Sequence, residues 1–346
     1  MSTPPPPAAS SGDVAITLAA VGAEHLSLQP CEPREPGRGE VRVRMLAAAI
    51  NPSDRMFVAG TYGTKPQPPC VPGFEGVGIV EACGGGLVAR AMKDRRVAVA
   101  VEQGGTWQSV VTTSAKTVIP VGSAMPIEHA ATFFVNPTTA WVMTREVLAV
   151  PPGKWLVQTA AASSLARMIA RLGRREGFKT CGIVRRESQR DALLAEGADA
   201  VVVFDAATQP AEELVEAVRT ACGEVRHAID PVGGPLGSAV LDCLGENGRM
   251  LVYGSLAEEP IAVASRPTIF HRRRIEGFAL GAWLQQRSLL AKGRLFLKIR
   301  RLVEDGTLAT GAVRSFAPEA FADALDPAST ASGEKGVFRF DGGEPG

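Results

Sequence analysis

The 346-residue sequence is poor in the residues that build metal centres and disulfide frameworks. It has only four histidines, and its six cysteines are scattered with no Cys-x-x-Cys pair. Such spacing argues against a structural zinc site made of four cysteines, and it is typical of reduced thiols in the cytoplasm. We therefore expect a cytoplasmic protein without bound metal.

Long apolar runs and a dominant charge are missing as well. No apolar run approaches the ~20 residues that span a bilayer, and the N-terminus lacks the apolar core of a secretory signal. The 37 Lys and Arg residues nearly balance 36 Asp and Glu residues, which leaves a net charge of +1. We therefore expect no membrane segment and no general attraction to nucleic acid.

The length predicts two domains, and the composition changes along the chain. Residues 1–12 are Pro, Ala and Ser with nothing to bury, which predicts a disordered tail. Residues 13–126 contain short β-branched runs separated by Pro and Gly, which predict β strands. Residues 127–281 alternate strand-like and helix-like segments, and they predict an α/β domain with a parallel sheet covered by helices. A basic amphipathic segment (Ser288–Glu304) and a last strand (Gly336–Phe340) follow.

A turn of small residues joins a strand predicted over Trp155–Ala160 to a helix predicted over Ser164–Gly177. Small side chains at such a turn let backbone amides of the helix N-terminus approach the phosphates of a dinucleotide. The usual Gly-x-Gly-x-x-Gly pattern is absent, because Ala and Ser stand in its place and Ala166 replaces the last glycine. The same residues also suit an ordinary helix capped by serine, and the turn alone leaves both interpretations open.

Two arginines follow the next predicted strand, Thr180–Val184. NAD-binding proteins usually place an acidic residue there, whereas an arginine pairs with the 2′-phosphate of NADP. Arg185 and Arg186 therefore favour NADPH over NADH, with two solvated arginines as the alternative.

Three strings carry a resemblance to a known family: Asn51-Pro52-Ser53-Asp54, Gly60-Thr61-Tyr62-Gly63 and Pro72-Gly73-Phe74-Glu75-Gly76-Val77-Gly78. The sequence resembles the medium-chain dehydrogenase/reductase superfamily, and within it the mitochondrial-type trans-2-enoyl-thioester reductases. The likeness extends over essentially the whole chain after the tail. It implies a GroES-like β-barrel catalytic domain made of residues 13–126 and 282–346, with a Rossmann NADP-binding domain at residues 127–281.

The resemblance also implies a zinc-independent member of this superfamily. Its zinc-dependent alcohol dehydrogenases carry a Cys in the segment held here by Asn51–Asp54, and a His before the Glu of the later string. Here Phe74 precedes Glu75, so two zinc ligands are replaced. We therefore expect no alcohol oxidation.

The implied reaction is NADPH-dependent reduction of the carbon–carbon double bond of a 2-enoyl thioester, with hydride added to Cβ and a proton to Cα. In the enoyl-thioester reductases the proton donor is a tyrosine in a motif like Gly60–Gly63, so the resemblance assigns that role to Tyr62. The chain has only two tyrosines, and Tyr253 stands where the family contacts the cofactor.

Further contacts are implied in the same way. Cofactor contacts are expected at Asn136, Ala162, Ser163, Ser164, Leu165, Arg185, Arg186, Tyr253, Gly254, Ser255, Leu256, Phe278, Ala279, Leu280, Gly281 and Lys335, and a substrate contact at Trp283. Each has an alternative: Asn136 also suits a helix cap, Phe278 and Trp283 also suit a core, and Lys335 also suits a solvated surface.

Partners and rival functions complete the expectations. The basic runs His271–Arg274 and Arg287–Arg301 suit either the phosphates of coenzyme A, the acidic face of an acyl carrier protein, or plain solvation. The family resemblance implies a homodimer. A quinone or enone reductase and a non-catalytic NADPH-binding protein are the two alternative functions.

Overall fold

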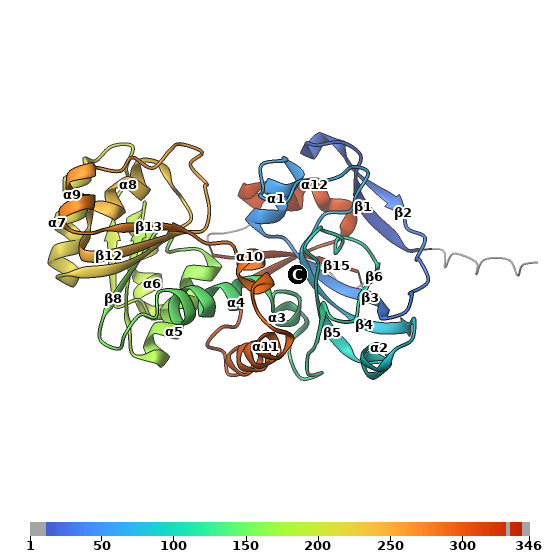
Figure 1. Cartoon of the computed structure of the whole chain (residues 1–346). Coiled ribbons are helices and arrows are strands. Elements are labelled where there is room, and N and C mark those ends of the chain that lie inside the picture. Colours follow the sequence, from blue (N-terminus) through green and yellow to red (C-terminus); the bar gives the residue numbers. More distant parts are fainter. Residues whose placement is uncertain (1–11, 330–332, 341–346) are drawn as a thin grey trace, which may run out of the picture. The chain divides into compact units, whose positions relative to one another are not determined.

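A computed structural model describes residues 12–329 and 333–340 (Figure 1). Apart from Gly12, the predicted N-terminal tail lies outside these residues. The chain forms two compact units: the first comprises residues 1–134 and 310–346, and the second comprises residues 135–309. The sequence placed the boundaries after residues 126 and 281. The second boundary lies later because the helices that follow residue 281 pack on a helix of the second unit.

The first unit is built on a seven-stranded sheet in which β6 also pairs with β3. Its strands run β14–β15–β3–β4–β5–β7, antiparallel except for the parallel pair β14–β15. The strands are β3 (Glu40–Ala49), β4 (Glu75–Cys83), β5 (Arg96–Ala100), β6 (Val110–Ser114), β7 (Val118–Pro120), β14 (Val313–Phe316) and β15 (Lys335–Arg339). A separate pair is formed by β1 (Val14–Leu18) and β2 (Leu26–Pro30).

Strand β3 shows why this sequence forms a sheet with one buried face. Val41, Val43 and Met45 alternate with arginines and are buried, as the two-residue period of a strand requires. On the other face Arg42 and Arg44 both pair with Glu81 of β4. Its described residues also form short α-helices: α1 (Pro52–Val58), α2 (Leu87–Met92), α3 (Ile127–Ala131) and α12 (Phe321–Leu325).

The second unit is built on a six-stranded sheet in which all strands are parallel. Its order, β10–β9–β8–β11–β12–β13, is the 3-2-1-4-5-6 order of dinucleotide-binding sheets. The strands are β8 (Trp155–Gln158), β9 (Lys179–Val184), β10 (Ala200–Val203), β11 (Val225–Asp230), β12 (Leu244–Val252) and β13 (Arg274–Gly277).

Helices alternate with these strands, as the sequence predicted. They are α4 (Val135–Trp141), α5 (Ser164–Glu176), α6 (Arg190–Glu196), α7 (Ala211–Cys222), α8 (Gly234–Asp242), α9 (Ser265–Phe270), α10 (Leu280–Gln285) and α11 (Leu289–Glu304). The helical stretch from Ile127 to Leu148 is not continuous: it is interrupted between α3 and α4, and a π-helical turn over Val142–Val147 follows α4. Pro137 explains the interruption, because it has no N–H to donate to the carbonyl four residues earlier.

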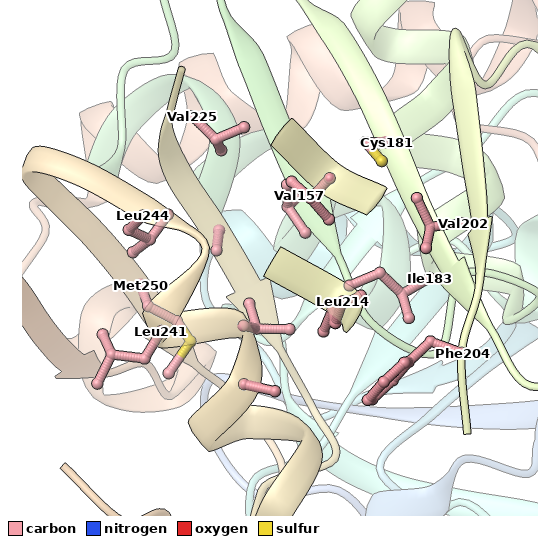
Figure 2. Packing of buried hydrophobic residues seen from close by; sticks show 14 residues of the cluster. Val157, Cys181, Ile183, Val202, Phe204, Leu214, Val225, Leu241, Leu244 and Met250 are labelled. Atoms are coloured by element: carbon pink, nitrogen blue, oxygen red, sulfur yellow. The ribbon is translucent and has the colours of Figure 1, made fainter. Parts of the chain in front are cut away.

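The core of the second unit lies between the sheet and its helices (Figure 2). Val157, Ile183 and Val202 come from adjacent strands, and Leu214 and Leu241 come from α7 and α8. All are less than a tenth exposed. This packing fixes where the carboxyl ends of the strands lie, and most of the candidate cofactor residues follow those ends. Among the described residues, no helix has the length and apolar character needed to cross a membrane.

Candidate active site

Tyr62 lies in the turn that follows α1, in the first unit. The amides of Thr61 and Tyr62 both donate to the Met56 carbonyl, at 2.8 and 3.1 Å, which attaches this turn to the helix. The half-buried Tyr62 ring packs against Phe74, with the ring centroids 5.2 Å apart. Burial, and then the nearby Asp54 carboxylate, raise the pKa of Tyr62 above its ordinary value. The phenol therefore stays protonated at neutral pH, as a proton donor must.

The carboxylate of Asp54 joins two segments around this tyrosine. It accepts hydrogen bonds from the Asn51 amide at 2.6 Å, at the start of α1, and from the Phe74 amide at 3.1 Å, just before β4. Asp54 is completely buried. That burial raises the pKa of Asp54 to about 7.

A buried polar cluster continues from Asn51. Its side-chain amide donates to Glu75 at 3.0 Å, and Glu75 also accepts from the Phe134 amide at 3.0 Å. The Lys335 ammonium donates to the Asn51 side-chain oxygen. Burial lowers the pKa of Lys335, although the Glu75 and Asp54 carboxylates favour its charge. Lys335 is thus buried in the first unit, not a solvated surface residue.

The side chains at the two zinc-ligand positions do not fit a zinc ion. Asn51 is committed to Glu75 and Lys335, and Phe74 offers a ring. Within residues 12–329 and 333–340, no three His, Cys, Asp or Glu side chains are grouped so that they could hold a metal. No step of the chemistry below is therefore routed through a metal.

The turn between β8 and α5 has the geometry of a phosphate-binding turn. Ala160 has a φ of +47°, a conformation that usually belongs to glycine. The Ser163 hydroxyl caps α5 by accepting from the Ala166 amide at 3.3 Å. The Ser164 hydroxyl is buried and has no hydrogen-bond partner within the described part of the chain. A cofactor phosphate would supply the partner that this hydroxyl lacks, so the residues present fit a dinucleotide.

Neighbouring groups that the sequence did not single out hold this turn. The Asp230 carboxylate, at the end of β11, accepts from the Val232 and Gly233 amides at 2.9 Å each and from the Thr159 hydroxyl. Gln158 donates to the Ala166 carbonyl at 3.0 Å. The sequence contains a pattern that could have predicted this role of Asp230: an acidic residue at the end of a strand, followed by Gly233-Gly234.

The two arginines expected at the adenosine phosphate directly follow β9. Arg185 and Arg186 are both exposed. Neither forms an ion pair with any described residue, whereas the neighbouring Glu187 pairs with Arg190 at 3.3 Å. Both guanidinium groups are therefore free to meet a phosphate.

Two further predicted segments follow adjacent strands of the same sheet. Tyr253 to Leu256 come directly after β12, and a Cβ added at Gly254 would lie 2.7 Å from the Pro231 carbonyl oxygen, so only glycine fits there. Phe278 to Gly281 follow β13, and the Phe278 amide donates to the Val252 carbonyl at 2.8 Å. Because carboxyl ends of parallel strands share one edge, these segments lie at the same edge as the phosphate turn.

The remaining predicted residues lie on helices of the second unit. Asn136 is in the first turn of α4 and is half-buried. Trp283 is on α10, where the Arg287 guanidinium lies 4.2 Å from the centre of its ring. Burial, followed by the charge of Asp230, raises the pKa of Tyr253, so this second phenol is also protonated at neutral pH.

Known proteins share these features over most of the chain. Residues 37–123 match the family described as alcohol dehydrogenase GroES-like domain, and residues 165–292 match the one described as zinc-binding dehydrogenase. The mitochondrial enoyl-acyl-carrier-protein reductase of Xenopus tropicalis is 32% identical over 274 residues, which are 78% of this chain and 77% of that protein.

Solved structures agree with the fold. A protein named as an NADPH:quinone reductase from Bacillus thuringiensis superposes with a TM-score of 0.85 at 29% identity, covering 95% of this chain and 99% of its own. The mitochondrial 2-enoyl thioester reductase heterodimer of Candida tropicalis gives 0.80 at 22% identity, covering 94% and 99%. The predicted α/β class, with a GroES-like unit and a Rossmann unit, is confirmed.

Proposed function

Because this chain belongs to the medium-chain dehydrogenase/reductase superfamily and is an oxidoreductase of the enoyl-reductase type, we propose that it reduces the double bond of a 2-enoyl thioester with NADPH. The observation that carries the proposal is the half-buried phenol of Tyr62, which packs on Phe74 and whose pKa is raised by burial. Such a phenol remains protonated at neutral pH and can give the proton that the α-carbon must receive.

The cofactor residues of the second unit are proposed to bind NADPH as a set. The backbone from Ala162 to Leu165 and the Ser164 hydroxyl take the pyrophosphate, and Arg185 and Arg186 take the 2′-phosphate. Asn136, Tyr253–Leu256 and Phe278–Gly281 complete the contacts predicted in the second unit, and Lys335 of the first unit is the one remaining predicted contact. When bound, NADPH supplies the hydride that adds to Cβ.

Tyr62 is the proposed proton donor of the reaction. Its O–H bond breaks as a C–H bond forms at Cα, and the phenolate then regains a proton from solvent. The Phe74 ring supports the tyrosine ring, and the turn bonds to Met56 keep the tyrosine attached to α1. Trp283 is proposed to contact the acyl chain.

The test follows NADPH oxidation with crotonyl-coenzyme A, a crotonyl thioester of acyl carrier protein, a simple enone and a quinone. We expect a thioester to give the highest kcat/KM, and Tyr62→Phe to lower kcat on it by about 10²–10⁴-fold. The variant retains the ring that packs on Phe74, so a loss reports the hydroxyl. Full activity of Tyr62→Phe on the best thioester would contradict the assigned role.

A quinone reductase is the second candidate function, because the Bacillus thuringiensis relative bears that name at 29% identity. It shares the fold but does not require a proton donor at Tyr62. A quinone as best substrate, with equal rates for wild type and Tyr62→Phe, would favour it. Binding of NADPH without its oxidation by any of the four compounds would favour a non-catalytic binding protein.

The thioester is proposed to arrive on an acyl carrier protein that docks on α11. Two hollows of about 290 and 370 Å³ flank Arg294 and Lys298 on this helix, with Trp141 and Leu297 among the apolar side chains that line them. Within the described part of the chain, five cations around these hollows form no ion pair: Arg287, Lys292, Arg294, Lys298 and Arg301. An acidic helix with apolar side chains complements such a surface.

Charge reversal separates carrier docking from catalysis. We expect Arg294→Glu/Lys298→Glu to raise KM at least about tenfold for the acyl-carrier-protein thioester while leaving crotonyl-coenzyme A unaffected. Arg90→Glu/Lys116→Glu, which reverses two exposed cations of the first unit, is the matched control. An equal rise in KM for both thioesters would instead indicate that the two hollows on α11 bind the phosphates of coenzyme A. An unchanged KM for both would indicate that this face of α11 is only solvated.

The protein is proposed to form a homodimer through the β13 edge of the six-stranded sheet, whose other edge is β10. Among the described residues, β13 has a partner strand on one side only. Ile275 on this strand and Ile269 and Phe270 on the preceding α9 are 40%, 65% and 72% exposed. Unpaired backbone beside exposed apolar side chains favours pairing with a second copy. The cytoplasmic location expected from the cysteines remains a prediction.

A further inference from the structure

The buried carboxylate of Asp54 has more contacts around Tyr62 than a helix cap needs. We propose that Asp54 is the positioning residue for the Tyr62 phenol, holding it against Phe74 in the orientation that proton delivery requires. This inference rests on the proton-donor role proposed above, and its test also includes a measurement that needs no turnover.

The first support is a closed path of contacts. From Asp54 on α1, the chain runs to a tight turn at Gly60, where φ is +70° and an added Cβ would lie 2.8 Å from the Val21 side chain. The turn presents Tyr62, whose ring packs on Phe74. The Phe74 amide then returns to the other oxygen of the Asp54 carboxylate. The ring that supports the tyrosine is thus linked to Asp54 by its own backbone amide, and the tyrosine is linked to Asp54 through α1 and the turn.

The second support is that both carboxylate oxygens are used. One accepts from the Asn51 amide and the other from the Phe74 amide. An asparagine at position 54 has only one acceptor oxygen, so one of these two buried amides would face an NH₂ group instead. A neutral substitution of the same size therefore removes either the acceptor for the Asn51 amide at the start of α1 or the link between α1 and Phe74.

The third support is electrostatic. The charged groups around Asp54 are Arg55 on its own helix, Glu75 on β4 and Lys335 on β15. The Tyr62 phenol is also near enough to be affected by the Asp54 charge. Of the two buried carboxylates, only Asp54 acts on Tyr62, and its charge raises the pKa of that phenol. The same side chain thus orients the donor and favours its protonated form.

The direct test is a spectrophotometric titration of Tyr62 in the apoprotein. Because the chain has only two tyrosines, a Tyr253→Phe background leaves Tyr62 as the only phenol. We expect Asp54→Asn to lower the pH at which the phenolate absorbance appears. Glu75→Gln removes an equally buried carboxylate of the same cluster, one that accepts from the Asn51 side chain and the Phe134 amide, and we expect it to leave the Tyr62 titration unchanged. Equal shifts in both variants, or none in either, would overturn the proposal.

The kinetic test is a double-mutant cycle. We expect Asp54→Asn to lower kcat on the best thioester up to about 10²-fold in wild type, with little further loss in Tyr62→Phe. Equal losses in both backgrounds would show that Asp54 serves folding alone and would overturn the proposal. If Tyr62→Phe is fully active, the proton-donor role fails instead, while the titration still measures the coupling.

A second, less disruptive variant tests the proposal even if Asp54→Asn does not fold. Phe74→Leu keeps the amide that donates to Asp54 and removes only the ring under Tyr62. We expect it to lower kcat while changing KM little, and to lose this effect in the Tyr62→Phe background. A folded Phe74→Leu protein with wild-type kcat would contradict the supporting role of the ring, and with it the positioning path.

Discussion

The Lys335 ammonium donates a hydrogen bond to the Asn51 side chain inside the first unit, and Lys335 is only 5% exposed. It is the cation that faces the Asp54 and Glu75 carboxylates. A buried carboxylate pair without such a cation is costly, because the interior screens the repulsion poorly. The position of this lysine therefore determines whether the cluster beneath Tyr62 is stable.

Lys335→Met should remove the charge while keeping much of the volume. We expect the free energy of unfolding in urea to fall by about 3–5 kcal/mol, the usual cost of breaking a buried ion cluster by removing one partner. Lys116→Met, at an exposed position, is the control and should change little. A loss below about 1 kcal/mol would show that the lysine charge compensates nothing. The NADPH dissociation constant of the same variant tests the predicted cofactor contact.

The pH dependence of stability should carry the signature of Asp54. Burial raises the pKa of Asp54 to about 7, whereas an unfolded aspartate titrates near about 4. The folded state therefore holds this proton more tightly, so the stabilising contribution is complete below about pH 4 and is lost as pH rises through about 7. Asp54→Asn has no such titration. We expect the stability advantage of wild type over Asp54→Asn to shrink between pH 5 and pH 8 in urea unfolding. Parallel pH profiles would contradict the raised pKa.

The arginines after β9 should set the choice between NADPH and NADH. Arg185→Ala/Arg186→Ala removes two unpaired guanidinium groups, so we expect KM for NADPH to rise at least about tenfold with KM for NADH nearly unchanged. Arg190→Ala, which removes the arginine paired with Glu187, is the control. A variant that loses affinity for both cofactors equally would show that these side chains serve the fold and not the 2′-phosphate.

Much of the fold follows from periodicity. The helix predicted over Ser164–Gly177 is observed as α5, and the apolar residues that recur along one of its faces, Leu165, Met168, Ile169 and Leu172, are all buried. Features that depend on a single residue could not be predicted from the sequence. Pro137 gave a hint of the break between α3 and α4, but a helix also accepts proline in its first turn, so this residue alone did not locate the break. The burial of Lys335 depends on Asn51, 284 residues away in the chain, and no local pattern reports a contact of that range.

The phosphate turn contains a feature that only the structure reveals. Ala160 has a φ of +47°, where a side chain costs about 1 kcal/mol relative to glycine. We expect Ala160→Gly to raise the free energy of unfolding by up to about 1 kcal/mol without weakening NADPH binding. Ala162→Gly, at a neighbouring position without a positive φ, should instead be destabilising. Thermal unfolding of both variants gives the comparison, and a destabilised Ala160→Gly would contradict the assigned strain.

The β13 edge of the six-stranded sheet gives the last prediction. Strand β13 is held to β12 by backbone pairing and by the Arg249–Glu276 ion pair, with two nitrogen–oxygen distances of 2.9 and 3.0 Å. Its outer side has no partner strand among the described residues, and Ile275 and Phe270 are exposed beside it. Light scattering of the 36.3 kDa chain should therefore report a dimer.

A charge at this edge should dissociate the dimer without unfolding the subunit, because the substituted side chains are exposed within it. We expect Phe270→Glu/Ile275→Glu to elute as a monomer with an unchanged circular dichroism spectrum. Leu87→Glu changes a side chain of the first unit that is 87% exposed, and it should remain dimeric. A wild-type monomer at micromolar concentration, or a dimer that tolerates both glutamates, would place the association elsewhere on the molecule or exclude it.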